Sequence, residues 1–147
     1  SDADCLVMIS VLEHVKNPNE FLRMFVKSKI KYLYIVVPLF SLSVYIENIF
    51  KDVYPRLLGG AHTHLYSKES LEYLVKNYKL KVIGEWWFGT EFVDLFRSFY
   101  VKSKFLKSNK PYFKKFEKIL INNLDNFQKI LDEKKLCSQV HMVLSKK

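Results

Sequence analysis

An unbroken apolar run, a helix-start signal and a second apolar run follow one another within the first 40 residues. Residues 5–12, CLVMISVL, and residues 31–40, KYLYIVVPLF, are apolar without alternation, which is typical of strands buried on both faces. Between them, Asn17 and Pro18 match the N-cap and the first position of a helix. Two strands joined by a helix form a βαβ unit, in which the strands are parallel. The sequence therefore predicts an α/β fold.

The rest of the chain continues this alternation of helical and strand patterns. A chain-terminal strand often joins such a sheet antiparallel, at its end. We therefore expect half of a doubly wound sheet, with its ligand crevice at the carboxyl ends of the strands. The patterns predict a helix or lid over 41–53, a helix capped by Ser67, a strand over 79–88, helices over 91–135 with a break at 108–111, and a final strand over 138–147.

Composition fits one globular domain with a lysine-rich surface. Of 147 residues 49% are hydrophobic, enough for a core, and the net charge is +9. Arg23, Arg56 and Arg97 are the only arginines among the 24 basic residues, and the lysines are spread over every segment. Because recognition of phosphate and bases depends on the planar fork of arginine, a solvated surface is favoured over a nucleic-acid site.

The cysteines and the apolar runs indicate in which cellular compartment the protein is expected. Cys5 and Cys137 lie far apart in apolar runs without CxxC spacing, so we expect buried, reduced thiols and no zinc site. No apolar run approaches the roughly 18 residues of a membrane span, and no signal-peptide pattern opens the chain. A cytoplasmic protein is expected. Because position 1 is serine and an apolar strand pattern begins by position 5, we expect the rear part of a longer protein.

Four segments, taken in order, resemble one enzyme family. DCLVMISVLEHVKNPNEFL resembles strand four and the following helix of class I S-adenosylmethionine-dependent methyltransferases, in the branch that carries LEHV. LYIVVP resembles their strand five, HTHLYSKESLEYLVKNYKLKVI the segment before strand six, and LCSQVHMVLSKK their antiparallel strand seven. The resemblance implies the C-terminal half of a doubly wound, Rossmann-like sheet, strands four to seven. Residues 1–90 and 136–147 would form the sheet and its helices, and 91–135 a helical insert.

The resemblance also shows what the chain lacks. The family binds S-adenosylmethionine mainly through a glycine-rich turn after strand one and an acidic residue at the end of strand two. Gly59, Gly60, Gly84 and Gly89 form no such turn, and strands one to three have no counterpart. We therefore expect the cofactor-binding N-terminal half to be absent, and this chain alone to be inactive.

The end of the first strand is the predicted cofactor wall. By the resemblance, Ser10, Val11, Leu12 and Glu13 line the pocket beside the methionine part of the cofactor. The alternative is that Leu12 belongs to the core while Glu13 faces solvent. His14 is either a general base for an acceptor hydroxyl or a histidine that bonds the backbone at a helix start.

No metal is predicted from the sequence. The ubiquinone-pathway O-methyltransferases hold a divalent metal with Glu-x-x-Glu-His, but Ser10 replaces the first glutamate here, and a hard cation needs several oxygen ligands. His62 and His64 are further base candidates. They resemble half a zinc site, but no third ligand lies near them in the sequence. His141, in the final strand, is expected to be structural.

Aromatic residues are the candidates for acceptor binding. Tyr45, Phe50, Trp86 and Trp87 could form apolar walls for the acceptor, with 91–135 as a lid; core packing is the alternative.

The family resemblance implies methyl transfer to a small-molecule or saccharide-like acceptor, with O-methylation favoured because histidine bases are available. The alternatives are an inert, methyltransferase-like interaction module and a nucleic-acid methyltransferase fragment. A homo-oligomer is also left open.

Overall fold

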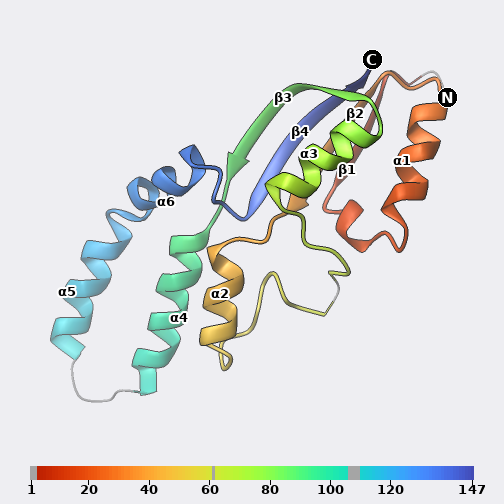
Figure 1. Ribbon diagram of the computed structural model, residues 1–147. Helices are drawn as coiled ribbons and strands as arrows, with labels where there is room; N and C mark the ends of the chain where they lie inside the picture. Colours follow the sequence, from red (N-terminus) through yellow and green to blue (C-terminus); the bar gives the residue numbers. More distant parts are fainter. Residues whose placement is uncertain (1–2, 61, 106–109) are drawn as a thin grey trace. The chain divides into compact units, whose positions relative to one another are not determined.

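The computed structural model describes residues 3–60, 62–105 and 110–147, and these form two compact units (Figure 1). The sheet unit comprises Ser1–Phe40, Gly60–Trp87 and Gln139–Lys147. The helical unit comprises Ser41–Gly59 and Phe88–Ser138. The elements are β1 (Cys5–Ile9), a 3-10 helix η1 (Leu12–His14), α1 (Pro18–Lys27), β2 (Tyr32–Pro38), α2 (Leu42–Ile49), α3 (Lys68–Asn77), β3 (Leu80–Phe88), α4 (Glu91–Phe105), α5 (Lys110–Ile121), α6 (Leu124–Glu133) and β4 (Gln139–Lys146).

The sheet has the order β1-β2-β4-β3. Strands β1 and β2 are parallel, from the pair Cys5↔Tyr32 to the pair Ile9↔Val36, so the predicted βαβ unit is confirmed. The chain-terminal strand β4 is antiparallel to β2, as expected. It lies between β2 and β3 rather than at the end of the sheet, and in Figure 1 the arrows of β3 and β4 point in opposite directions.

Local signals fix the two helices of the sheet unit. The Asn17 side chain accepts a hydrogen bond from the Glu20 amide (3.2 Å), and Pro18 occupies the first turn of α1, as predicted. Ser67 caps α3 through a reciprocal pair of bonds with Ser70: each amide donates to the other residue's hydroxyl, at 3.2 and 2.8 Å.

Both helices cover the same face of the sheet. Alternate strand residues point to that face, and the helices add the apolar sides predicted from their periodicity. The core therefore lies between one sheet face and the pair α1 and α3. Its buried members include Met8, Leu33, Ile35, Val37, Val140, Met142 and Leu144 from the sheet, Leu22 and Phe25 from α1, and Leu71 and Leu74 from α3.

The opposite sheet face is exposed along β1, which corrects the prediction that β1 is buried on both faces. Val7 and Ile9 are 55% and 57% exposed, and Tyr32, which pairs with Cys5 at the start of β2, is also exposed. The reason is that β1 forms an edge of the sheet, and α1 and α3 both pack on the other face. In the described part of the sheet unit, only one face of β1 is therefore covered, although its sequence is apolar throughout.

His141 also points to this second face, as its place in the alternation of β4 predicts. Its Nδ1 is hydrogen-bonded to the Tyr34 hydroxyl, and the Trp86 ring lies 5.2 Å away, centroid to centroid. Burial lowers the pKa of His141, which favours a neutral ring that accepts the Tyr34 proton.

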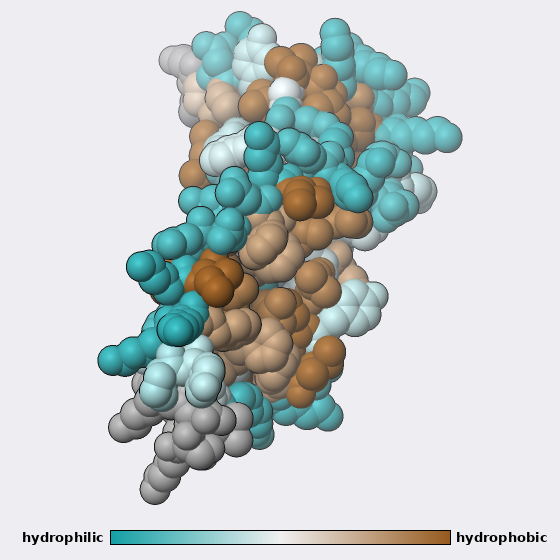
Figure 2. Space-filling model, turned by 90° about the vertical axis from the view of Figure 1, so that its left-hand side faces the viewer, coloured by the Kyte–Doolittle hydropathy of each residue, from teal (hydrophilic) through white to brown (hydrophobic). Residues whose placement is uncertain are grey.

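The helical unit contains the helices predicted over 41–53 and 91–135. Helix α2 ends at Ile49, four residues before the predicted limit, and α4, α5 and α6 divide the second range. The predicted break at 108–111 falls partly outside the described residues. Figure 2 looks onto the side that carries α5 and α6, where apolar patches alternate with hydrophilic side chains; Phe116, Ile119 and Ile130 are among the exposed apolar residues. Among the described helices, none has the length and apolar character needed to cross a membrane.

The assignment of the two sheet faces predicts unequal effects of two similar substitutions. Ile35→Ala is expected to lower the free energy of unfolding by about 2–5 kcal/mol, because Ile35 is fully buried and its loss leaves a cavity. The matched control is Ile9→Ala on the neighbouring strand, for which a change below about 1 kcal/mol is expected. Urea unfolding followed by circular dichroism measures both. Equal losses would contradict the assignment.

Candidate functional site

The chain turns sharply at the carboxyl end of β1. Ser10 has a φ of 51°, in the left-handed region that residues with a side chain rarely adopt, and its amide donates to the Val36 carbonyl at 3.1 Å. Because of this turn, β1 ends at Ile9, and Leu12–His14 form the 3-10 helix η1 instead of continuing the predicted strand. The turn places Glu13 and His14 at the carboxyl edge of the sheet.

A second segment is attached to this turn by three hydrogen bonds. The backbone carbonyl of Glu13 accepts from the Thr63 amide (3.0 Å), the His64 amide (3.2 Å) and the Thr63 hydroxyl (2.7 Å). Further along, Tyr66 pairs with Leu39 in a parallel bridge just beyond β2. Residues 62–66 therefore run from the end of β1 to the end of β2, along the carboxyl edge where a doubly wound sheet binds ligands.

This attachment brings Glu13, His14 and His62 together. One ligand atom from each lies within 4.8 Å of the other two, and the two imidazole rings are 5.0 Å apart, centroid to centroid. The Glu13 carboxylate is 1% exposed, with its Oε1 atom 3.9 Å from Nε2 of His14. Its Oε2 atom is buried and has no hydrogen-bond partner among the described residues. The sequence alternative of a solvent-facing Glu13 is therefore wrong.

His64 lies next to this cluster but is not part of it. Its Nδ1 is 2.9 Å from the Thr63 hydroxyl, which already donates its only proton to the Glu13 carbonyl. Nδ1 of His64 must therefore carry a proton and donate to Thr63, which leaves Nε2 as the nitrogen with a lone pair when the ring is neutral. The ring of His64 also stacks on Tyr66 at a centroid distance of 6.4 Å.

Tyr66 lies next to the cluster, between His64 and the backbone of Leu12. Burial, and then the charge of Glu13, raise the pKa of Tyr66 to about 12. It is therefore protonated at neutral pH, and its hydroxyl donates to the Leu12 carbonyl at 3.4 Å. Sequence reasoning missed Thr63 and Tyr66, although both lie in the same HTHLY segment as the two histidines.

The predicted cofactor wall is only partly open. The side chains of Ser10 and Val11 are exposed, whereas that of Leu12 is completely buried in the core. The alternative that Leu12 is a core residue is therefore confirmed, and its side chain does not form a pocket wall. A shallow hollow nearby is lined by Val15, Lys16, Asn17, Glu20, Phe21 and Met24, and contains none of the histidines.

The predicted acceptor residues lie in both units. Tyr45 on α2 is exposed, while Phe50 packs edge-on against Phe99 with ring centroids 5.6 Å apart. On β3, Trp86 is exposed beside His141, and Trp87 packs against the core of the sheet unit. The alternative of core packing therefore applies to Phe50 and Trp87.

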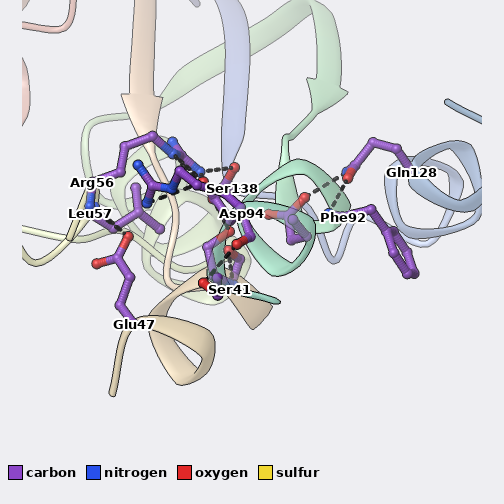
Figure 3. A network of polar contacts seen from close by, with 12 residues as sticks. Ser41, Glu47, Arg56, Leu57, Phe92, Asp94, Gln128 and Ser138 are labelled. Carbon is purple, nitrogen blue, oxygen red and sulfur yellow. Dashed lines mark hydrogen bonds and ion pairs between the residues drawn. The ribbon is translucent and has the colours of Figure 1, made fainter. Parts of the chain in front are cut away.

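A polar network inside the helical unit was not predicted (Figure 3). Asp94 on α4 accepts hydrogen bonds from the Ser43 hydroxyl (2.7 Å) and from Nη2 of Arg56 (2.7 Å). The same nitrogen of Arg56 donates to the Ser138 hydroxyl at 3.1 Å. Glu47 on α2 accepts from three successive backbone amides, those of residues 56–58. These bonds tie α2, the following loop and α4 into one scaffold.

Gly89 is required at the start of α4. A Cβ atom there would lie 2.1 Å from Oε2 of Glu91 and 2.7 Å from the Ser138 amide nitrogen. Glu91 is completely buried, and this Oε2 atom accepts from Nε2 of Gln128 on α6 at 2.6 Å. The close approach therefore lets α4 and α6 share a buried hydrogen bond.

Comparison with known proteins gives a likeness of fold. No protein-family model matches the chain, and no curated protein matches it. A solved structure from Galdieria sulphuraria, assigned as a sarcosine dimethylglycine methyltransferase, is similar with a TM-score of 0.50 and 10% identity, over 98% of this chain and 53% of that chain. The chain has a methyltransferase-like fold.

The [4+2]-cyclase SpnF is similar over 97% of this chain and 49% of its own, with a TM-score of 0.47 and 8% identity. The chain thus spans about half the length of both structures. The α/β sheet with a final antiparallel strand, predicted as the C-terminal half of such a domain, is confirmed at the level of the fold.

The buried network of the helical unit predicts a large effect of removing one charge. Asp94→Asn is expected to lower the free energy of unfolding by about 2–3 kcal/mol, because the Arg56 guanidinium loses its charged partner. The matched control is Asp52→Asn, since Asp52 is exposed and its ion pair with Lys102 lies at the surface. Thermal and urea unfolding measure both variants. A loss for Asp52→Asn as large as that for Asp94→Asn would contradict the structural role of the network.

Proposed function

We propose that this chain is the C-terminal half of an S-adenosylmethionine-dependent methyltransferase domain that methylates a hydroxyl oxygen of a small-molecule or saccharide-like acceptor. The observation that carries the proposal is the sheet order β1-β2-β4-β3, with a parallel pair and the chain-terminal strand inserted antiparallel. The likeness to the Galdieria sulphuraria protein, assigned as a methyltransferase, supports it.

The exposed apolar side of β1 supports the division into halves. Val7, Ile9 and Tyr32 expose apolar surface on the face opposite α1 and α3, and β1 has an unpaired edge in the described sheet. A doubly wound sheet has helices on both faces. We assign the missing strands and helices, with the glycine-rich turn and acidic residue that bind the cofactor, to a segment that precedes Ser1.

The residues present fit one wall of the cofactor site. Ser10 and Val11 are exposed at the sheet edge, immediately after β1, where they would lie beside the methionine part of S-adenosylmethionine. Leu12 would contribute through its backbone, because its side chain is in the core. The cofactor supplies the chemistry, an activated methyl group on a sulfonium, and the protein aligns the acceptor and excludes water.

The histidine segment fits the acceptor side. Among the predicted bases His14, His62 and His64, the hydrogen bonding favours His64, whose Nδ1 is held by Thr63 so that Nε2 can take a proton from an acceptor hydroxyl. Trp86, an exposed aromatic residue of the sheet unit, is assigned as an acceptor contact. We propose that the helical insert 91–135 determines which acceptor is methylated.

The proposal predicts that cofactor binding requires the preceding segment. A protein extended upstream of Ser1 is expected to bind S-adenosylmethionine in calorimetry, and the 147-residue chain at least about tenfold more weakly. In the extended protein, Val11→Trp should block binding, whereas Val26→Trp on α1 should not. An extended protein without affinity for the cofactor would instead support the inert interaction module.

Kinetics of variants of the extended protein distinguish a role in proton removal from a role in cofactor binding. His64→Ala is expected to lower kcat about 10²–10⁴-fold while the cofactor Kd stays unchanged, because only proton removal is lost. Tyr73→Ala, at an exposed position of α3, is the control and should keep its kcat. Unchanged turnover of the His64 variant would exclude His64 as the base.

A further inference from the structure

We propose that Glu13, His14 and His62 form a binding site for one divalent transition-metal ion of the zinc type. The proposal departs from our sequence prediction, which assigned no metal to the chain. That prediction was based on Ser10 in place of a carboxylate and on the lack of a third ligand near in sequence. The fold supplies the third ligand from a segment some 50 positions away along the chain.

The geometry is close to that of a metal site. The three ligand atoms lie within 4.8 Å of one another, and Oε1 of Glu13 is 3.9 Å from Nε2 of His14. Around a tetrahedral ion with bonds of about 2.0–2.1 Å, ligand atoms are roughly 3.4 Å apart. The separations in the cluster therefore exceed the tetrahedral value by at most about 1.4 Å.

The buried carboxylate is the observation that points to a cation. Glu13 is almost completely buried, and its Oε2 atom has no hydrogen-bond partner in the part of the chain that the structure describes. A buried carboxylate oxygen without a partner is costly, and a bound cation removes this cost.

The backbone holds the ligands in place before any ion binds. The Glu13 carbonyl accepts three hydrogen bonds from Thr63 and His64, the two residues that follow His62. The two ligand segments are therefore joined directly beside the ligand side chains. Such preorganisation reduces the conformational entropy that metal binding would otherwise cost.

The ligand types select the class of metal. Two imidazoles and one carboxylate suit zinc, cobalt and other first-row transition ions, whereas magnesium and calcium prefer oxygen ligands throughout. Three protein ligands leave a fourth position open, as in catalytic rather than structural zinc sites, and that position can bind water or an acceptor oxygen. The site does not depend on the proposed methyl transfer, because metal binding can be measured without cofactor or acceptor.

The experiment is a titration of the metal-free chain with Zn²⁺ and Co²⁺. Cys5 is exposed, which contradicts the predicted burial of both thiols, whereas Cys137 is buried. A Cys5→Ser background therefore removes an exposed thiol that otherwise binds the same ions. We expect one equivalent of Zn²⁺ by calorimetry, and with Co²⁺ a visible absorption band typical of low coordination number. His62→Ala and Glu13→Gln should each weaken binding at least about tenfold. His64→Ala is the matched control and should keep the affinity, because His64 lies outside the cluster.

Thermal unfolding provides a second readout that reports folding as well as binding. Zn²⁺ should raise the Tm of the background chain and leave that of His62→Ala unchanged, since a ligand stabilises only a state that binds it. If His62→Ala does not fold, His14→Ala replaces it as the ligand deletion. The proposal is overturned if the background chain binds no Zn²⁺, if His62→Ala and Glu13→Gln bind as tightly as it does, or if His64→Ala loses as much affinity as they do.

Discussion

The three hydrogen bonds to the Glu13 carbonyl determine how the candidate site is built. They join the turn after β1 to residues 62–64, which are distant in the sequence, and place Glu13, His14 and His62 against one another. Without them, these side chains would belong to two separate loops at the sheet edge. The proposed base and the proposed metal ligands all depend on this attachment, because His64 and His62 lie on either side of Thr63.

Most of the fold could be predicted because its signals are local. The cap at Asn17, the capping serine Ser67 and the apolar periodicity of the helices each act within a few residues, and each reappears in the structure. The end of β1 could not be predicted, since the left-handed turn at Ser10 interrupts an otherwise apolar run. Nor could the exposure of Val7 and Ile9, because burial depends on which elements are present to cover a face.

The site could be predicted in part. The sequence placed Glu13 and His14 at a strand end and selected His62 and His64, but side-chain pairing across some 50 residues leaves no local pattern. For the same physical reason, the bond between Arg56 and Asp94 was missed. The sequence prediction of no metal considered only ligands that lie near one another along the chain, whereas the cluster joins residues from two segments.

Amide hydrogen exchange tests most directly whether the two segments are joined. Since the Thr63 and His64 amides both donate to the Glu13 carbonyl, at 3.0 and 3.2 Å, both should exchange far more slowly than amides in an unfolded chain. The amides of β2 in the centre of the sheet serve as the internal reference for a folded chain. If β2 is protected while Thr63 and His64 exchange at unfolded rates, the segments are not joined and the account of the site is wrong.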